Sequence, residues 1–146
     1  MQVTKVLMEP SYELFDHTAD IGIRVFAATP AELLHPATEG LYAAVGELVP
    51  SGEAETASVD LTGDDEALLL RDYLTEVLMW MECSRRMVVA VGVEEFNARR
   101  LAATLETRPI DEERSSLDRE VKAITYHQLA IERVANGYRA TIIVDI

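Results

Sequence analysis

The longest periodic run of apolar residues lies in the middle of the chain, and its spacing is that of an α-helix. Gly63-Asp64-Asp65 has the composition of a helix entry, and apolar residues then recur every three or four positions up to about Ser84. This stripe consists of Leu69, Tyr73, Val77, Trp80 and Met81. A central helix of this kind needs other elements to cover its apolar side.

A second helix is predicted after Thr29. In Thr29-Pro30-Ala31-Glu32, the threonine can cap free backbone amides, the proline presets the first helical dihedral and the glutamate can reach back to the cap. Pro36 lies inside the apolar pattern, so we expect it to remove one hydrogen bond and kink the helix. The apolar face consists of Leu33, Leu34, Ala37, Leu41, Ala44 and Val45.

The segments around these helices have the patterns of β-strands. We expect strands at residues 12–15, 21–26, 57–61, 87–93, 101–107, 121–134 and 138–146. The sequence therefore predicts an α+β fold, in which residues 12–146 form a single layered domain with two main helices packed on a mainly antiparallel sheet. Residues 1–11 are expected to form a flexible N-terminal extension.

The last two strands are predicted to form a hairpin around Asn136-Gly137, a pair that tolerates the dihedrals of a tight turn. With these two as loop residues, Asp145 lies opposite Gln128 and Ile146 opposite His127. One face then carries the core candidates His127, Leu129, Ile131, Ile142 and Val144, and the other carries Lys122, Ile124, Tyr126, Gln128 and Asp145. On a straight strand Lys122 is about 20 Å from Asp145 at ~3.3 Å per residue, so only a bulge or bend would bring them together.

Composition limits the compartment and the partners. The chain has 26 Asp and Glu against 13 Lys and Arg, which gives a net charge of -13. This charge repels phosphate backbones and disfavours direct nucleic-acid binding, whereas it attracts cations or basic protein surfaces. The same acidity also serves solubility alone. A single cysteine, Cys83, expected to be buried or incidental, and the lack of a signal peptide or membrane-spanning run favour a cytoplasmic protein.

Oxygen-bearing side chains gather in two places. Asp16-His17-Thr18-Ala19-Asp20 joins two predicted strands and could hold a hard cation, which prefers several oxygen ligands. Asp145 and Ile146 end the last strand with two negative groups, and their approach to Asp20 would require a cation or a proton. Structural Asx turns, a structural His17 and a frayed terminus explain the same residues without a ligand.

Conventional catalytic signatures are missing from the sequence. The seven glycines are scattered and form no phosphate-binding loop, and there is neither a G-x-S-x-G elbow nor an HExxH pair. Two functions of other classes stay open. One is a metal-dependent phosphoesterase that activates water with Asp16, His17, Asp20 and Asp145. The other is an acidic chaperone or adaptor that needs no metal.

Three segments together resemble the archease family: YELFDHTADIG at residues 12–22, EVKAITYH at 120–127 and IIVDI at 142–146. LLLRDYLTEVL in the central helix extends the similarity from about Tyr12 onward. The resemblance implies an α+β fold and a protein that is not itself an enzyme. Its implied role is to promote guanylylation and turnover of an RtcB-type RNA ligase, which joins RNA ends in tRNA splicing and RNA repair.

The resemblance also implies roles for individual residues. Asp20 and Asp145 correspond to metal-binding acids, Ile146 supplies backbone or terminal oxygens, and Lys122 corresponds to a lysine needed for activation. Asp16 and His17 would lie behind the ligands. The implied cofactor is a divalent cation, calcium in most descriptions of the family. The implied partner is the ligase, with RNA reached only through it and no membrane involved. An alternative role for Lys122 is a surface salt bridge with Glu120 or a neighbouring acid.

Overall fold

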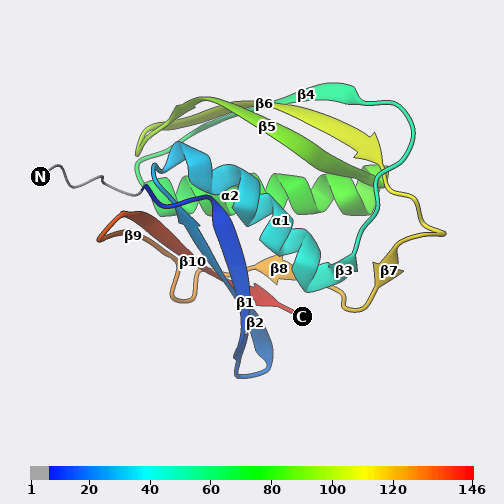
Figure 1. The fold of residues 1–146 in the computed structure, drawn as a ribbon, viewed down its shortest axis with the longest axis horizontal. Helices are drawn as coiled ribbons and strands as arrows, with labels where there is room; N and C mark the ends of the chain where they lie inside the picture. The colour runs from blue at the N-terminus through cyan, green and yellow to red at the C-terminus, as the bar shows by residue number, and fades with distance from the viewer. Residues whose placement is uncertain (1–6) are drawn as a thin grey trace, which may run out of the picture.

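In the computed structural model, which describes residues 7–146, two helices lie between two antiparallel sheets (Figure 1). The helices are α1 (Leu34–Val45) and α2 (Glu66–Met79). The predicted α+β class, with two main helices and antiparallel strands, is confirmed. The strands form two larger sheets, so each helix is covered from both sides. The prediction about residues 1–11 concerns mainly positions 1–6, which lie outside the described residues, and Ser11 already begins a strand.

The larger sheet runs in the order β1-β2-β10-β8, and β9 also pairs with β10. Its strands are β1 (Ser11–His17), β2 (Asp20–Ala27), β8 (Ala123–Ile124), β9 (Ala130–Val134) and β10 (Gly137–Asp145). The second sheet has the order β4-β6-β5, from β4 (Glu55–Thr62), β6 (Arg100–Pro109) and β5 (Arg86–Phe96). The short strands β3 (Gly46–Glu47) and β7 (Ser116–Leu117) pair with each other. No helix among residues 7–146 is both long enough and apolar enough to cross a membrane.

The predicted start of α2 is confirmed, whereas α1 begins later than predicted, at Leu34. The Asp65 carboxylate accepts a hydrogen bond from the Leu68 N–H at 3.0 Å and so caps α2. The Thr29 hydroxyl accepts from the Glu32 N–H at 3.3 Å, and a 3-10 turn, Ala31–Leu33, leads into α1. Pro36 therefore falls in the first turn of α1, where its missing N–H costs no α-helical bond. The expected loss of a hydrogen bond in the helix interior is thus avoided.

Beyond Met79 the central helix continues as a π-helical turn, Trp80–Ser84, and ends at Arg85 in the left-handed conformation with φ 52°. Cys83 lies in this turn and is exposed, so it is not the buried thiol that was one of the two expectations. Left-handed geometry is common at a helix C-terminus but is normally occupied by glycine, because a side chain there costs about 1–2 kcal/mol.

Arg85→Gly should therefore raise the free energy of unfolding by about 0.5–1 kcal/mol, after subtraction of the extra entropy that glycine gives the unfolded chain. The ion pair that is lost, between Arg85 and Glu112, is exposed and contributes little. Denaturant unfolding measures the change. Arg114→Gly is the matched control, because Arg114 is exposed and is not at positive φ. Equal changes in both variants would contradict the strain explanation.

Two buried tyrosines connect the helices to their surroundings. The Thr38 hydroxyl donates to the Leu34 carbonyl at 2.7 Å, so its contact with the Tyr73 hydroxyl at 2.6 Å has tyrosine as the donor. The Tyr42 hydroxyl accepts from the Val88 N–H at 2.7 Å. Burial raises the pKa of Tyr73 to about 12, and burial likewise raises the pKa of Tyr42. Both phenols are thus neutral in the folded protein at ordinary pH.

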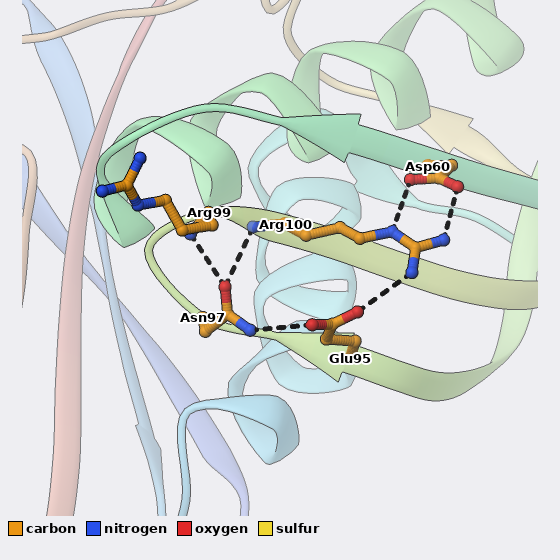
Figure 2. A network of polar contacts seen from close by, with 5 residues as sticks. All are labelled: Asp60, Glu95, Asn97, Arg99 and Arg100. Carbon is orange, nitrogen blue, oxygen red and sulfur yellow. Dashed lines mark hydrogen bonds and ion pairs between the residues drawn. The ribbon is translucent and has the colours of Figure 1, made fainter.

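The second sheet, β4-β6-β5, carries an exposed polar network centred on Arg100 (Figure 2). The Arg100 guanidinium binds both carboxylate oxygens of Asp60, at 2.9 and 2.6 Å, and one of Glu95 at 3.0 Å. Because these residues come from β6, β4 and β5, one side chain ties all three strands together. Hydrogen bonding from Arg100 lowers the pKa of Asp60. The network has a structural role that the sequence did not indicate.

The C-terminal hairpin forms, but its predicted register is wrong, and the strand that pairs with β10 is interrupted rather than continuous. Gly137 pairs with Val134, so the loop residues are Ala135 and Asn136. Gly137 is not at positive φ. It is needed because a Cβ there would clash with the carbonyl oxygen of Ala27. The shift is by two positions, which preserves the faces, and Ile131 packs against the core as predicted.

The second strand of that hairpin is also interrupted. Thr141 pairs with Ala130, whereas Val144 pairs with Ile124, so three steps along β10 correspond to six along the other strand. The extra residues form a loop at 125–129, in which Gln128 is left-handed with φ 52°. Ile124 consequently turns to the core face and is buried, contrary to the prediction.

Candidate functional site

The end of β2 brings the predicted acids together. Asp20 lies directly opposite His17 in β1 and directly opposite Asp145 in β10. Opposed residues in antiparallel strands share a face, with Cβ atoms about 4.5–5.5 Å apart. The adjacent pair, Ile21 and Val144, is buried in the core. Asp20 and Asp145 therefore lie side by side on the outer face of the larger sheet.

His17 belongs to the same group. Its Nδ1 atom is 3.7 Å from an Asp20 carboxylate oxygen, which is too far for a hydrogen bond. This nitrogen is buried and lacks a hydrogen-bond partner, so its polar capacity is unused. Asp16 is opposite Ile21 and alternates with His17, which places it on the other face of β1. Of the two residues predicted to lie behind the ligands, only His17 is near Asp20.

His127 also reaches this group, although sequence reasoning had placed it on the core face. Its ring centroid is 5.2 Å from that of His17, at an angle of 63° between the ring planes. The loop at 125–129 carries it out of the sheet, and its side chain is exposed. The only sequence signal was its position in the segment EVKAITYH, since the periodic pattern pointed the other way.

Lys122 lies next to Asp145, so the predicted separation of about 20 Å at ~3.3 Å per residue is wrong. Its backbone N–H donates to the Asp145 carbonyl at 2.7 Å, and the following residue, Ala123, is the pairing partner of Asp145. The loop at 125–129 absorbs the intervening residues. Because Ala123 rather than Lys122 lies opposite Asp145, the prediction that Lys122 and Asp145 share a face of the sheet is wrong. The Lys122 side chain is exposed, and none of the ion pairs within residues 7–146 includes it. The salt bridge with Glu120 is thus not formed.

The arrangement fits part of a hard-cation site. Asp20 and Asp145 place two carboxylates side by side, and across the described residues neither forms an ion pair with lysine or arginine. Ile146 follows in the chain, so its backbone oxygen is close enough in sequence to contribute. Calcium takes six to eight oxygen ligands, so these residues would supply only part of its shell.

Side chains alone do not complete the site. No group of three histidine, cysteine or acidic side chains within residues 7–146 is placed to hold a metal ion. The histidine pair therefore does not turn the site into a nitrogen-rich one of the kind preferred by zinc. Any cation here would depend on backbone oxygens, water or a partner protein for its remaining ligands.

The prominent cavities lie away from these acids. One, of about 640 Å³, is formed by the end of α1, the π-helical turn and the loop around β7. A second, of about 530 Å³, lies at the start of α2 beside the loop at 125–129. Neither Asp20 nor Asp145 lines either one. The open cavity beside the acids that would favour a phosphoesterase is therefore not among them.

Comparison with known proteins gives consistent matches over most of the chain. The model of the Archease protein family matches residues 12–146. Protein archease of Methanopyrus kandleri is 30% identical over 138 residues, covering 92% of this chain and 99% of that protein. Protein archease of Saccharolobus islandicus is 33% identical over 151 residues, covering 93% and 99%.

Two solved structures are similar in fold. The solution structure of protein 1598 of Methanobacterium thermoautotrophicum has a TM-score of 0.71 and 24% identity, and the match covers 93% of this chain and 99% of that one. A crystal structure from Thermotoga maritima, described as an archease and possible chaperone, has a TM-score of 0.67 and 19% identity, with coverage of 90% and 94%.

Proposed function

This chain belongs to the archease family, and we propose that it is a metal-binding activator of an RtcB-type RNA ligase, promoting guanylylation and multiple turnover of that enzyme. One observation carries the proposal. Asp20, Asp145 and Lys122, which come from three distant segments, converge at one end of the larger sheet. The convergence supports a shared role, because a structural role for each residue separately would not require it.

The chemistry of the three residues suits a site that meets an anion. The carboxylates of Asp20 and Asp145, with backbone oxygen from Ile146, would hold a divalent cation, most suitably calcium. Such a cation would supply positive charge for a phosphate or carboxylate of the partner. Lys122 adds an exposed ammonium group, which can act as a positioned charge on a phosphate during nucleotide transfer. RNA would be reached only through the ligase, since a net charge of -13 repels it.

The proposal is tested by a multiple-turnover ligation assay with the purified ligase, with and without this protein. We expect faster guanylylation and more product per ligase molecule when the protein is present. The protein alone should show no ligation and no phosphatase activity. Metal-dependent phosphatase activity that disappears in Asp20→Asn would contradict the proposal in favour of the phosphoesterase. Activation that is unaffected by chelation of divalent cations would favour the adaptor that needs no metal.

Lys122→Ala should lower activation in this assay at least about 10-fold, because removal of a positioned charge-stabilising donor typically costs more than that. Thermal stability and calcium affinity should be unchanged, since the side chain is exposed and forms no ion pair among the described residues. Arg114→Ala, on the exposed loop before β7, is the control and should activate fully. Full activation by Lys122→Ala would contradict the role, and so would a simultaneous loss of calcium binding.

A further inference from the structure

A cavity of about 530 Å³ lies where α2 begins and the loop at 125–129 passes over it. Its walls differ in character. One wall is acidic and consists of Asp64, Asp65 and Glu66. The other wall is largely apolar and includes Leu68, Tyr126 and Leu129. No lysine or arginine is among its lining residues. The cavity can therefore accept an apolar group on one side and a positive charge on the other.

Tyr126 is the most exposed large hydrophobic residue of the described chain, with 64% of its surface accessible. It is nevertheless held in place. The Arg71 guanidinium lies 4.2 Å from the centre of its ring, and Arg71 is itself fixed by hydrogen bonds of 3.0 Å to the Ile124 carbonyl and the Asp72 carboxylate. The guanidinium thus packs against the ring, while most of the residue stays accessible. An exposed tyrosine that packs on an arginine beside a cavity is typical of a residue that anchors a protein interface.

Leu68 extends this apolar surface, because 40% of it is exposed although it lies on the first turn of α2. Asp64 and Glu66 line the same cavity and are not paired with any lysine or arginine within residues 7–146. Unpaired carboxylates next to exposed apolar side chains repel RNA phosphates and attract basic protein segments. The chemistry of the surface therefore selects a protein over a nucleic acid.

One loop connects the cavity to the acidic site, although the acids themselves do not line the cavity. Tyr126 precedes His127, whose ring is 5.2 Å from that of His17, and His17 lies opposite Asp20. A partner that covers Tyr126 would thus also reach the end of β2. The larger cavity of about 640 Å³ lacks this charge pattern, because Arg85 and Arg119 are among its lining residues.

We propose that the cavity between the start of α2 and Tyr126 is the docking site for a segment of the ligase in which an apolar side chain stands beside lysine or arginine. The inference rests on the proposed function, since the ligase is the partner. The apolar side chain packs between Tyr126 and Leu68, and the cation faces Asp64 and Glu66. Docking here positions the partner over the acidic site without any contact with RNA.

The test measures binding of the purified ligase to immobilised protein at several salt concentrations. Tyr126→Ala should raise the dissociation constant of the complex at least about 30-fold, as expected of an interface anchor. Asp64→Lys should raise the dissociation constant about 10-fold and make binding less sensitive to salt concentration. Leu117→Ala is the control, because Leu117 is 58% exposed but lines the larger cavity, and it should bind as wild type does. Calcium affinity should be the same in all variants.

The possible outcomes separate this inference from the proposed function. If the wild-type protein binds no ligase, both fail. If the wild type binds and Tyr126→Ala and Asp64→Lys bind equally well, the docking site alone is wrong, and the same holds if only Leu117→Ala loses binding. Binding of an RNA oligonucleotide to the chain alone, lost in Tyr126→Ala, would also overturn the inference. Asp64 is exposed and does not cap α2, so Asp64→Lys should fold normally. This variant therefore still tests the docking site if Tyr126→Ala folds poorly.

Discussion

Asp145→Asn should abolish calcium binding and lower ligase activation at least about 100-fold, because it removes one of the two side-chain carboxylates that lie together at the end of β2. Asparagine has nearly the same shape, so the pairing of β10 with β2 and β8 should persist. The Lys122 N–H binds the backbone carbonyl of Asp145, which the substitution leaves in place. Calorimetric titration with calcium and with magnesium measures the affinity, and the ligation assay measures the activation.

The control for this variant lies in β1, the strand that pairs with β2 on the side away from β10. Asp16→Asn removes the same charge from the residue before His17. The Asp16 side chain lies on the face of β1 opposite to that of His17, so this variant should leave calcium affinity unchanged. With divalent cations chelated, Asp145→Asn should be at least as stable as the wild type, since it removes repulsion between adjacent carboxylates. Unchanged calcium affinity in Asp145→Asn, or an equal loss in Asp16→Asn, would refute the assignment of the site.

Raising the pH from about 10 to about 12 should lower the free energy of unfolding by about 2–3 kcal/mol through Tyr73 alone. The pKa of a tyrosine in the unfolded chain is about 10, whereas burial raises that of Tyr73 to about 12 in the folded protein. Within this window the unfolded state releases a proton that the folded state retains. The contribution is therefore fully present below about pH 10 and is lost as the pH rises through the folded pKa.

Tyr42 adds to this effect in the same direction, because burial raises its pKa as well. Denaturant unfolding at a series of pH values measures the slope. Tyr73→Phe should be less stable at neutral pH by about 0.5–1.5 kcal/mol for the lost hydrogen bond to Thr38. Its stability should nevertheless fall less steeply above about pH 10. The same slope in Tyr73→Phe as in the wild type would show that another group controls alkaline unfolding.

The sequence alone determined those features that depend on short-range patterns. Asp65 caps α2, and Thr29 caps the 3-10 turn that leads into α1, because a cap needs only the amides two or three residues further on. The strand predicted at residues 21–26 is confirmed, and Ile21 and Ile23 lie in the core because side chains on a strand alternate between its two faces. The acids Asp20 and Asp145 were singled out by residue type and by family resemblance, while their convergence was only a conditional prediction.

The tertiary structure decided the rest, and the C-terminal hairpin shows why. Gly137 was assigned to the turn, although its function is to let β10 pass close to the Ala27 carbonyl, a contact with a segment far away in the sequence. The loop at 125–129 depends on Gln128 in a left-handed conformation that its residue type does not signal. Pairing register is set by contacts between distant strands. For this reason only the folded chain could show that Lys122 lies beside Asp145 and His127 beside His17.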